Sequence, residues 1–484
     1  MRHPRRFAAP LAVAAFASSG LAAEPEAERA GNPATDWFQE AGWGVFVHYL
    51  EGLQNDPEEV HSLGRRTSWD ECVKEFDCER FARAMEEAGA GYVIFTMQQI
   101  SRFLIAPNAT FDRLTGYRPG EACATRDLVE DLYAALAPRK IRLLLYWTGD
   151  GPRGDPRAAA ALGHTPVQTV AYVRKWADVA REYAERYGEK VAGWWVDGCY
   201  PWIGYDDEKL GILARALKAG NPRRIVALNP GVQDRVLPYS RHEDFTTGEQ
   251  NSFSDLPSGR WTGGEQWHIL SFLGCGFQGW AQPGSKYKKR DLVEYVYEAT
   301  RLGGVVSIDV LLYRDGGVDR SQLEILKALR PGAAALARRE PVPPGNLASH
   351  RPARLLSLDG SRDLPVNSGV RFARLGVDGD PKTFAQAAGE WPWTYEVALG
   401  RPAKVRRVAI LFDPGCYATS FDVLLSADGR AWEKVASREG HDGSGVELEF
   451  EPREARCVRI AGRKPDGPGQ PGSQMAIAEL GVYE

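Results

Sequence analysis

The segment from Val191 to Tyr200 places a carboxylate at the end of a short apolar run. The run is aromatic and β-branched, and Gly198 breaks it directly after Asp197, so it predicts a buried strand rather than a helix. Barrel enzymes place catalytic carboxylates at such strand ends, which makes Asp197 a candidate catalytic residue. Because Asp-Gly is also a common turn dipeptide, the alternative is that Asp197 caps a turn or the next helix.

Short apolar runs alternate with amphipathic runs between Trp37 and about Arg330. The apolar runs predict eight strands, at Gly44–His48, Tyr92–Thr96, Arg142–Trp147, Gly193–Asp197, Ile225–Asn229, about 244–249, about 275–280 and Val305–Val310. The amphipathic runs predict helices at Cys78–Ala88, Thr125–Leu136 (with Thr125 as the N-cap), Thr165–Tyr187, Glu208–Ala219, Arg290–Leu302 and Ser321–Leu329. Eight strands with intervening helices favour an α/β fold of the (β/α)8 TIM-barrel type over an open sheet. No glycine-rich phosphate loop follows the first strand, which argues against dinucleotide binding.

A proline-rich segment, residues 333–345, predicts a linker between two domains. The α/β pattern occupies residues 34–332, before this linker. In residues 346–484 the helical periods disappear, and short alternating runs are separated by turns such as Asp428-Gly429. This pattern predicts an all-β second domain, built as a β-sandwich.

Residues 1–23 have the basic head, short apolar run and small-residue cleavage context of a secretory signal peptide. No later segment is long and apolar enough to span a bilayer, so we expect a soluble, secreted or periplasmic protein without membrane insertion. The balance of 60 Lys and Arg against 64 Asp and Glu argues against nucleic acid as a partner. The sequence does not indicate the oligomeric state.

The chain contains seven cysteines, which in an exported protein permit disulfides and leave at least one thiol unpaired. Cys72 and Cys78 lie close together, and Cys416 and Cys457 fall in the same C-terminal module, so these are the candidate pairs. No Cys/His spacing matches a zinc site.

Several segments of the α/β region match a known family in order and spacing. They are Trp37-Phe38, Gly44–His48, Phe76-Asp77, Ala88–Ala90, Tyr92–Thr96, Arg126–Val129, Leu145–Trp147 and Trp195–Gly198. Together they resemble the α-L-fucosidases of glycoside hydrolase family 29 across most of the barrel. The resemblance implies a glycosidase in which Asp197 is the nucleophile and which needs no cofactor for catalysis.

Retaining glycoside hydrolysis needs a second carboxyl, about 5–5.5 Å from the nucleophile, that protonates the leaving oxygen and later deprotonates water. Glu249 and Glu265 are the two candidates on the later loops. Glu249 ranks ahead because residues 247–249, Thr-Gly-Glu, match the family's Thr-x-Glu pattern. The alternative for each glutamate is a solvated loop carboxylate.

The resemblance also implies a set of substrate-binding residues. His48 matches a family histidine that contacts a sugar hydroxyl, and Trp195 would pack on the apolar face of the sugar. The structural alternatives are a strand-end histidine bonded to backbone and a tryptophan that fills the core. The remaining predicted binding residues are Gln98, Gln99, Trp147, Asn229, Trp267 and Asp309.

Three sugar-reading elements of the family are changed in this chain. Residues 97–103, with two glutamines, stand where the family has a Lys-His-His-Asp-Gly-Phe-like run. Residues 229–231, Asn-Pro-Gly, stand where the family has an arginine, and residues 305–310, with Asp309, replace an Asn-Leu-Leu-Leu-Asn run. A site built to bind particular hydroxyls rejects sugars that lack them, so these changes favour an altered sugar specificity or a loss of activity.

The C-terminal domain resembles the discoidin, or coagulation factor 5/8 type C, sandwich of carbohydrate-binding modules of family 32, a jelly-roll fold. The matching residues are Asn346–Ala348, Val377–Asp380, Tyr417–Phe421, Ser426–Gly429, Trp432 and Ala478–Leu480. The resemblance implies a structural Ca²⁺ site, because calcium prefers oxygen ligands on tight loops; its residues would be Asp378, Asp380, Thr383 and Glu479. The alternative role for these residues is turn capping. Three aromatic residues could form a sugar platform or pack in the core: Trp391, Trp393 and Tyr395.

We therefore predict an exported α-L-fucosidase-like glycosidase that removes a terminal sugar from an oligo- or polysaccharide by retaining double displacement. One alternative is an enzyme of the same fold that cleaves another sugar, such as an L-galactoside or an anionic polysaccharide unit. The other is a non-catalytic carbohydrate-binding protein with a degenerate barrel.

Overall fold

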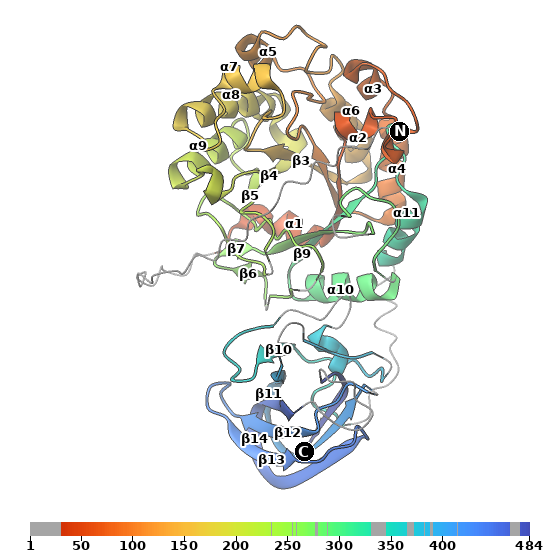
Figure 1. The fold of residues 1–484 in the computed structure, drawn as a ribbon, viewed down its shortest axis with the longest axis vertical. Coiled ribbons are helices and arrows are strands. Elements are labelled where there is room, and N and C mark those ends of the chain that lie inside the picture. The colour runs from red at the N-terminus through yellow and green to blue at the C-terminus, as the bar shows by residue number, and fades with distance from the viewer. Residues whose placement is uncertain are drawn as a thin grey trace, which may run out of the picture.

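The computed structural model describes residues 31–330 and 345–484, apart from residues 234, 254, 258, 276–278, 288, 365–371, 382, 388–390, 414 and 465–474. The expected signal peptide, residues 1–23, and residues 333–344 of the expected linker lie outside the described residues. Two bodies follow each other along the chain, an α/β domain and an all-β domain (Figure 1). They meet through α10 (Lys289–Arg301), where Tyr295 contacts Phe372 with ring centroids 5.2 Å apart.

The α/β domain is built on a seven-stranded parallel sheet in the order β5-β4-β3-β2-β1-β9-β8. Its strands are β1 (Trp43–Val47), β2 (Tyr92–Thr96), β3 (Arg142–Thr148), β4 (Val191–Asp197), β5 (Ile225–Leu228), β8 (His268–Phe272) and β9 (Val305–Val310). Most strand positions are fully buried on both faces, as parallel sheets covered by helices require. A two-stranded antiparallel sheet, β6 (Trp261–Thr262) and β7 (Glu265–Gln266), precedes β8.

The segment of residues 244–250 bridges the two edge strands and makes the sheet barrel-like. Its backbone bonds to β5 through Asp244 N and Val226 O at 2.8 Å, and to β8 through Gln250 N and Leu270 O at 2.9 Å. Gly248, with φ of +55°, permits this approach, since a Cβ there would lie 1.9 Å from the carbonyl oxygen of His268. The sixth expected strand, about residues 244–249, is therefore found at the predicted position, although it pairs with its neighbours only through isolated β-bridges.

The seventh expected strand, about residues 275–280, is wrong. The strand is β8, seven residues earlier, and Cys275 and Trp280 lie in a bend and a turn; residues 276–278 are outside the described part. The apolar run from His268 to Leu273 pairs with β9, whereas the glycines that follow suit a turn.

Helices cover the outside of the sheet (Figure 1). They are α1 (Asp36–Ala41), α2 (Glu51–Gln54), α3 (Trp69–Lys74), α4 (Cys78–Ala88), α5 (Ala109–Thr115), α6 (Leu128–Leu136), α7 (Pro156–Leu162), α8 (Val170–Tyr187), α9 (Asp207–Leu217), α10 and α11 (Arg320–Leu326). Short 3₁₀ turns are η1 (Pro33–Thr35), η2 (Val60–Ser62), η3 (Ala137–Arg139), η4 (Gly188–Lys190), η5 (Pro201–Ile203), η6 (Lys327–Leu329) and η7 (Ala373–Gly376). All six expected helices are present. The expected Thr125 cap is wrong: the carboxylate of Asp127 accepts from Glu130 N and begins α6.

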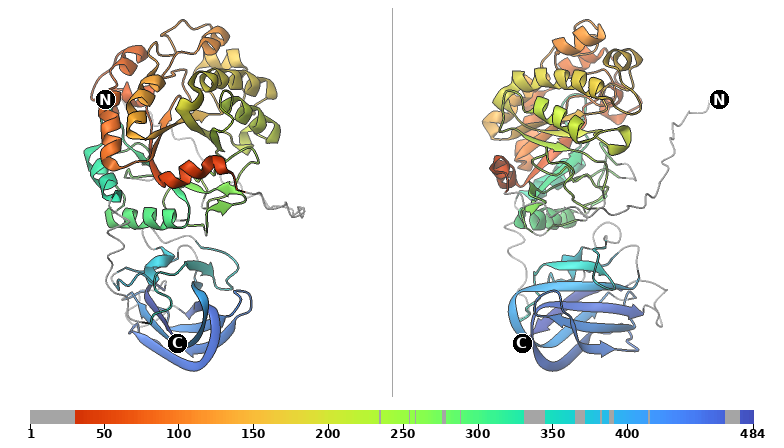
Figure 2. Two further views of the ribbon diagram at one scale, coloured as in Figure 1. Left: turned by 180° about the vertical axis from the view of Figure 1, so that it is seen from behind. Right: turned by 90° about the vertical axis from the view of Figure 1, so that its left-hand side faces the viewer.

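The second domain is an antiparallel sandwich with the strand order β10-β11-β14-β12-β13, and β15 pairs with β11. Its strands are β10 (Ala353–Ser357), β11 (Trp393–Phe412), β12 (Ser420–Ser426), β13 (Glu433–Arg438), β14 (Val446–Lys464) and β15 (Ile477–Tyr483). The two longest strands, β11 and β14, run side by side with register shifts that let them bend around the core (Figure 2). Trp393 and Tyr395 are fully buried in that core, so they pack rather than form a sugar platform, and Trp391 packs against it partly buried.

All seven cysteines lie among the described residues and none forms a disulfide, so the expected pairs Cys72–Cys78 and Cys416–Cys457 are wrong. The thiol of Cys72 faces the hydroxyl of Tyr49 at 3.7 Å, and that of Cys78 faces the guanidinium of Arg126 at 3.4 Å. Across the described residues, the helices fall short of the length and apolarity that crossing a bilayer demands.

Candidate active site

The carboxyl ends of the parallel strands surround a cavity of about 290 Å³. Because all strands of the sheet run the same way, the residues that end or follow them meet at one face of the domain. The cavity is lined by Phe46, His48, Leu50, Leu53, Gln99, Tyr146, Trp195, Asp197, Glu249, Leu270, Trp280 and Ala281. Five predicted site residues are therefore brought together here: His48, Gln99, Trp195, Asp197 and Glu249.

The carboxylate of Asp197, at the end of β4, is held by three donors. Its Oδ2 accepts from the Tyr146 hydroxyl at 2.7 Å, and its Oδ1 accepts from the Tyr200 hydroxyl at 2.7 Å and from Asn229 Nδ2 at 2.9 Å. Burial, followed by the nearby charge of Asp197, raises the pKa of both phenols well above the usual value, so both remain donors. These bonds fix the carboxylate in one orientation beside the cavity.

The amide of Asn229 also reaches the second carboxyl, because Nδ2 donates to Glu249 Oε2 at 2.6 Å. Two further hydrogen bonds fix the orientation of this amide: Asn229 Oδ1 accepts from Gly231 N at 3.1 Å and from Thr247 Oγ1 at 3.2 Å. One nitrogen thus joins both carboxyls. Asp197 Oδ1 and Glu249 Oε2 consequently lie no further apart than the two bonds laid end to end, 5.5 Å.

The cavity changes the acidity of Glu249. Burial and, after it, the charge of Asp197 raise the pKa of Glu249 to about 8, and the bond from Asn229 opposes the rise. At neutral pH Glu249 is therefore mostly protonated. A protonated carboxyl beside a second carboxyl is the arrangement that glycosidases use for an acid and a nucleophile.

His48, which follows β1, also lines the cavity. Its Nδ1 lies 2.9 Å from Asp309 Oδ2, and Asp309 Oδ1 accepts from Ala281 N at 2.6 Å. Asp309 is fully buried in β9 and does not line the cavity, so it acts on the cavity through His48.

Aromatic rings form the floor of the cavity. Trp195 and Tyr146 stack with centroids 5.5 Å apart at an interplanar angle of 16°, and Phe46 meets both rings edge-on. Gln99 donates from Nε2 to the Tyr146 hydroxyl at 2.8 Å. Gln98 is buried and turned into its own loop, where Nε2 donates to Ser101 O at 2.6 Å, so it does not line the cavity.

Three predicted site residues lie elsewhere. Trp147 is on the outer face of β3, stacked on Trp176 of α8 at 4.5 Å, because side chains alternate along a strand and Tyr146 points inward. Trp267 and Glu265 precede β8 and so lie at the amino ends of the strands, away from Asp197; Glu265 lines a separate hollow there of about 670 Å³. These placements correct the expectation that Trp147, Trp267 and Glu265 belong to the site.

The sequence analysis missed Tyr146, Tyr200 and Trp280. Tyr146 lies next to Trp195 in the register of β3 and β4, and Tyr200 follows Asp197 by three residues. The alternation of β3 places Tyr146 and Trp147 on opposite faces, which was the available signal once Trp195 was assigned to the cavity.

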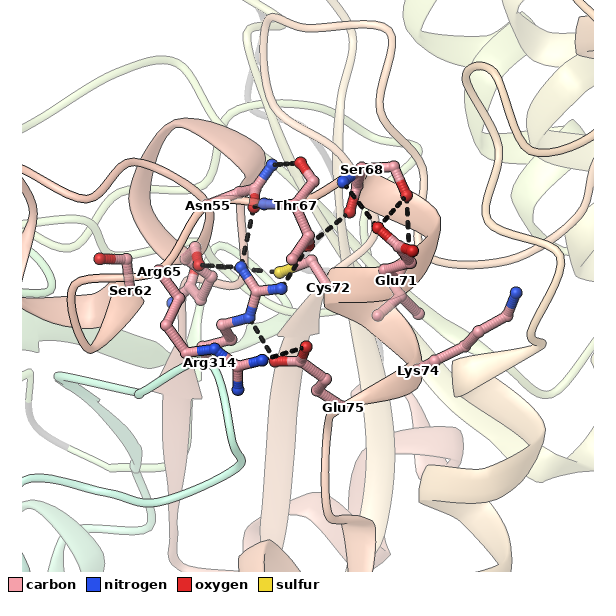
Figure 3. Close-up of polar contacts among 12 residues, drawn as sticks. Asn55, Ser62, Arg65, Thr67, Ser68, Glu71, Cys72, Lys74, Glu75 and Arg314 are labelled. Atoms are coloured by element: carbon pink, nitrogen blue, oxygen red, sulfur yellow. Dashed lines mark hydrogen bonds and ion pairs between the residues drawn. The ribbon is translucent and has the colours of Figure 1, made fainter.

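A buried arginine fixes the loop that follows His48 (Figure 3). Arg314, in the loop after β9, donates to Glu75 Oε2 at 2.6 Å, to Asn55 Oδ1 at 2.8 Å and to Thr67 Oγ1. Gln54, the residue before Asn55, in turn donates to His48 O at 2.9 Å. These hydrogen bonds join the loop after β1 to the loop after β9, next to the backbone of His48.

In the second domain, the residues expected to hold calcium lie in one loop and the adjacent strand β15. The Thr383 hydroxyl lies 3.0 Å from both oxygens of Asp378, Asp380 N donates to Asp378 Oδ1 at 2.9 Å, and Gly379 N donates to Glu479 Oε2 at 3.0 Å. Burial and the charges of Asp378 and Asp380 raise the pKa of Glu479 to about 8, against the bond from Gly379. In the part of the chain that the structure describes, no group of three or more His, Cys, Asp or Glu side chains is arranged to hold a metal ion. The calcium site stays a prediction.

The family model of α-L-fucosidase matches residues 68–330, more than half of the chain, which includes every strand of the sheet except β1. The chain belongs to the α-L-fucosidase family. Its second domain matches the model of the NedA-like, galactose-binding domain of F5/8 type C over residues 375–460. The glycosidase assignment and the carbohydrate-binding type of the second domain thus agree with the resemblances read from the sequence.

Solved structures with similar folds include two α-L-fucosidase family proteins. A putative α-L-fucosidase from Bacteroides thetaiotaomicron is 13% identical over 94% of this chain and 97% of its own, with a TM-score of 0.45. A Ruminococcus gnavus GH29 fucosidase in complex with fucose is 13% identical over 96% and 97%, with a TM-score of 0.41. A chitosan-binding module of a Paenibacillus sp. chitosanase/glucanase is 26% identical over 29% of this chain and 98% of its own, with a TM-score of 0.24. No curated protein matches the chain.

Proposed function

We propose that this protein is an exported α-L-fucosidase that removes a terminal α-L-fucose from a glycan with retention of anomeric configuration. The observation that carries the mechanism is the shared amide of Asn229, which keeps oxygens of Asp197 and Glu249 within 5.5 Å. This upper bound fits the 5–5.5 Å of retaining enzymes and lies below the roughly 6.5–9.5 Å that separates the carboxyls of inverting enzymes.

In the first step, an Asp197 oxygen attacks the anomeric carbon and forms a glycosyl ester, while Glu249 transfers its proton to the departing glycosidic oxygen. In the second step, the ionised Glu249 takes a proton from water, the water oxygen attacks the anomeric carbon, and the ester bond to Asp197 breaks. The raised pKa of Glu249 supplies the acid form at neutral pH. The Tyr146 and Tyr200 hydroxyls orient the nucleophile.

The cavity lining favours fucose among related sugars. Fucose is a 6-deoxy sugar, and its methyl group suits the apolar side chains that line the cavity, among them Leu50, Leu53 and Trp280. No Lys or Arg occurs among the described lining residues, which disfavours an anionic sugar unit. Gln98, however, faces its own loop rather than the cavity, so the polar contacts that the family makes with the sugar are reduced here. The second candidate substrate is therefore an L-galactoside, which has a hydroxyl on C6.

Hydrolysis of aryl α-L-fucosides and aryl α-L-galactosides by the wild type and by Asp197→Ala tests this proposal. We expect fucoside turnover that the substitution abolishes, with α-L-fucose as the first anomer seen by NMR. Glu265→Gln is the matched control, because it removes a carboxyl at the other end of the strands and should leave turnover intact. Turnover of the galactoside alone would establish the second candidate, and activity that survives Asp197→Ala would overturn the nucleophile assignment.

For the second domain, we propose that the module binds a carbohydrate and holds the catalytic domain near its glycan. The match to a galactose-binding domain model supports this role. Binding of fluorescent glycans to the full chain, with Asp197→Ala to prevent hydrolysis, would test it.

A further inference from the structure

Trp202 is the most exposed of the large apolar side chains in the described residues, at 66%. Single exposed apolar residues are common on protein surfaces and by themselves indicate nothing. This one is distinguished by its place, in the 3₁₀ turn η5 that begins four residues after Asp197.

The indole of Trp202 packs against two neighbouring residues, Tyr200 and Gly231. It stacks on the ring of Tyr200 with centroids 4.5 Å apart and an interplanar angle of 18°, and Gly204 N donates to Pro201 O at 3.0 Å to close the turn. Gly231, with φ of +99°, leaves room for the indole, since a Cβ there would lie 2.8 Å from Trp202 Cη2. The Tyr200 hydroxyl donates to Asp197, so the exposed ring and the nucleophile belong to one connected unit.

The loop of residues 229–233 places Trp202 on the Glu249 side of the nucleophile. Asn229 donates to the Glu249 carboxyl, Gly231 lies against Trp202, and Gln233 N donates to Glu249 O at 3.0 Å. His48 and Trp280 also line the cavity, with ring centroids 6.4 Å apart. If Glu249 protonates the leaving oxygen, the leaving group departs on the side where Trp202 stands.

We propose that Trp202, backed by Tyr200, is the platform of a leaving-group subsite that stacks on the apolar face of the sugar attached to the fucose. A pyranose presents C–H groups on one face, and an exposed indole that already stacks on Tyr200 is suited to cover them at little entropic cost. The proposal rests on the proposed function, and it specifies the substrate as an oligosaccharide whose leaving group is itself a sugar.

The test compares two substrates that differ only in the leaving group. α-L-Fucosyl fluoride has a leaving atom too small to reach Trp202, whereas a fucosylated disaccharide presents a sugar ring to it. We expect Trp202→Ala to lower kcat/KM by about 5- to 30-fold for disaccharides of the preferred linkage and by less than about twofold for the fluoride. Trp202→Phe should keep most of the activity on the disaccharide.

Leu237→Ala is the control, because Leu237 is 50% exposed on the loop after β5 and should affect neither substrate. An equal loss of kcat/KM on both substrates would show that Trp202 only supports the fold of the site. An unchanged kcat/KM on both would contradict the proposed subsite. Failure of the proposed function is distinct, since the wild type would then not hydrolyse the fluoride. In that event, calorimetry measures the binding of N-acetyllactosamine and of chitobiose to the wild type and to Trp202→Ala. Weaker binding by the variant supports the role of Trp202 as a sugar platform, and equal binding overturns it.

Discussion

His48 and Asp309 lie at opposite ends of the α/β domain's sequence, and their side chains meet at 2.9 Å across the neighbouring strands β1 and β9. Nδ1 is the ring nitrogen that Asp309 engages, which leaves Nε2 for a contact with substrate. We expect Asp309→Asn to lower kcat/KM by about 10- to 100-fold, because the amide replaces a carboxyl that holds Nδ1 and the ring is then free to turn.

A double-mutant cycle shows whether Asp309 acts through His48. We expect Asp309→Asn to cost little more once His48→Ala is present, because the two residues act as one unit. Additive losses, measured as kcat/KM on an aryl fucoside, would mean that Asp309 supports the site by another route.

The acidity of Glu249 sets the alkaline limit of activity. Its proton is needed for the first step, and its pKa is raised to about 8, so kcat/KM should fall as pH rises through about 8. Glu249→Gln should strongly lower kcat/KM for substrates with poor leaving groups and spare kcat/KM for α-L-fucosyl fluoride, whose departure needs no protonation. Its kcat on the fluoride should still fall, because the second step then lacks the base that deprotonates water. An alkaline limb near pH 8 that remains in Glu249→Gln would have to be assigned to another group.

The same shift predicts an effect on stability. The unfolded chain releases the Glu249 proton near pH 4.3, whereas the folded protein retains it up to about pH 8, so folding stability is lost as pH rises through this window. Glu249→Gln should therefore raise the Tm of the α/β domain at pH 8 to 9 and change it little at pH 4. Calorimetry at both pH values is the measurement.

Asn229 keeps the two carboxyls at the distance that retention requires. Asn229→Ala should lower kcat and move the alkaline limb to higher pH, because the amide bond lowers the pKa of Glu249. A structural defect alone would lower activity without moving the limb. Asn229→Asp should be more damaging, since it adds a third carboxyl between Asp197 and Glu249.

The order of strands and the strand-end carboxylates could be predicted from the sequence, because each lies in a local pattern with its own turn chemistry. Asp197 ends an apolar run before a glycine, and Glu249 ends the Thr-Gly-Glu segment. Both reach the cavity because parallel strands deliver their ends to one face. The contact of Asn229 with both carboxyls could not be predicted, because it depends on the conformation of the loop after β5. From the sequence, Asn229 was predicted only as a binding residue that replaces a family arginine.

The errors in placing site residues have two physical sources. Between residues 265 and 280 two apolar stretches compete for one strand, and choosing the later one placed Glu265 and Trp267 at the wrong end of the sheet. Along β3, alternation assigns Tyr146 and Trp147 to opposite faces, but which face is inside depends on the neighbouring strand β4. The prediction named Trp147, whereas the inward position belongs to Tyr146.

The loop of Asp378 and Asp380 offers a test by metal addition and removal. We propose that Ca²⁺ binds beside Glu479, because a cation would stabilise the ionised form of this carboxyl, whose pKa is raised by burial and then by the charges of Asp378 and Asp380. Millimolar Ca²⁺ should then raise the Tm of the second domain, chelator should reverse the rise, and Glu479→Gln should abolish it. A Tm unaffected by Ca²⁺ would leave these residues the role of capping their own turn.

Arg314 and Arg65 share the partner Glu75 but differ in burial, with the side chain of Arg314 1% and that of Arg65 58% exposed. Removing the buried cation takes one donor from each of Glu75, Asn55 and Thr67, so Arg314→Met should destabilise the α/β domain by about 3 kcal/mol. Arg65→Ala should cost less than about 1 kcal/mol, because water screens an exposed pair. Urea unfolding followed by domain-specific fluorescence measures both. Because the same cluster anchors the loop after His48, Arg314→Met should also raise KM, and an unchanged KM would show that the loop holds its position without it.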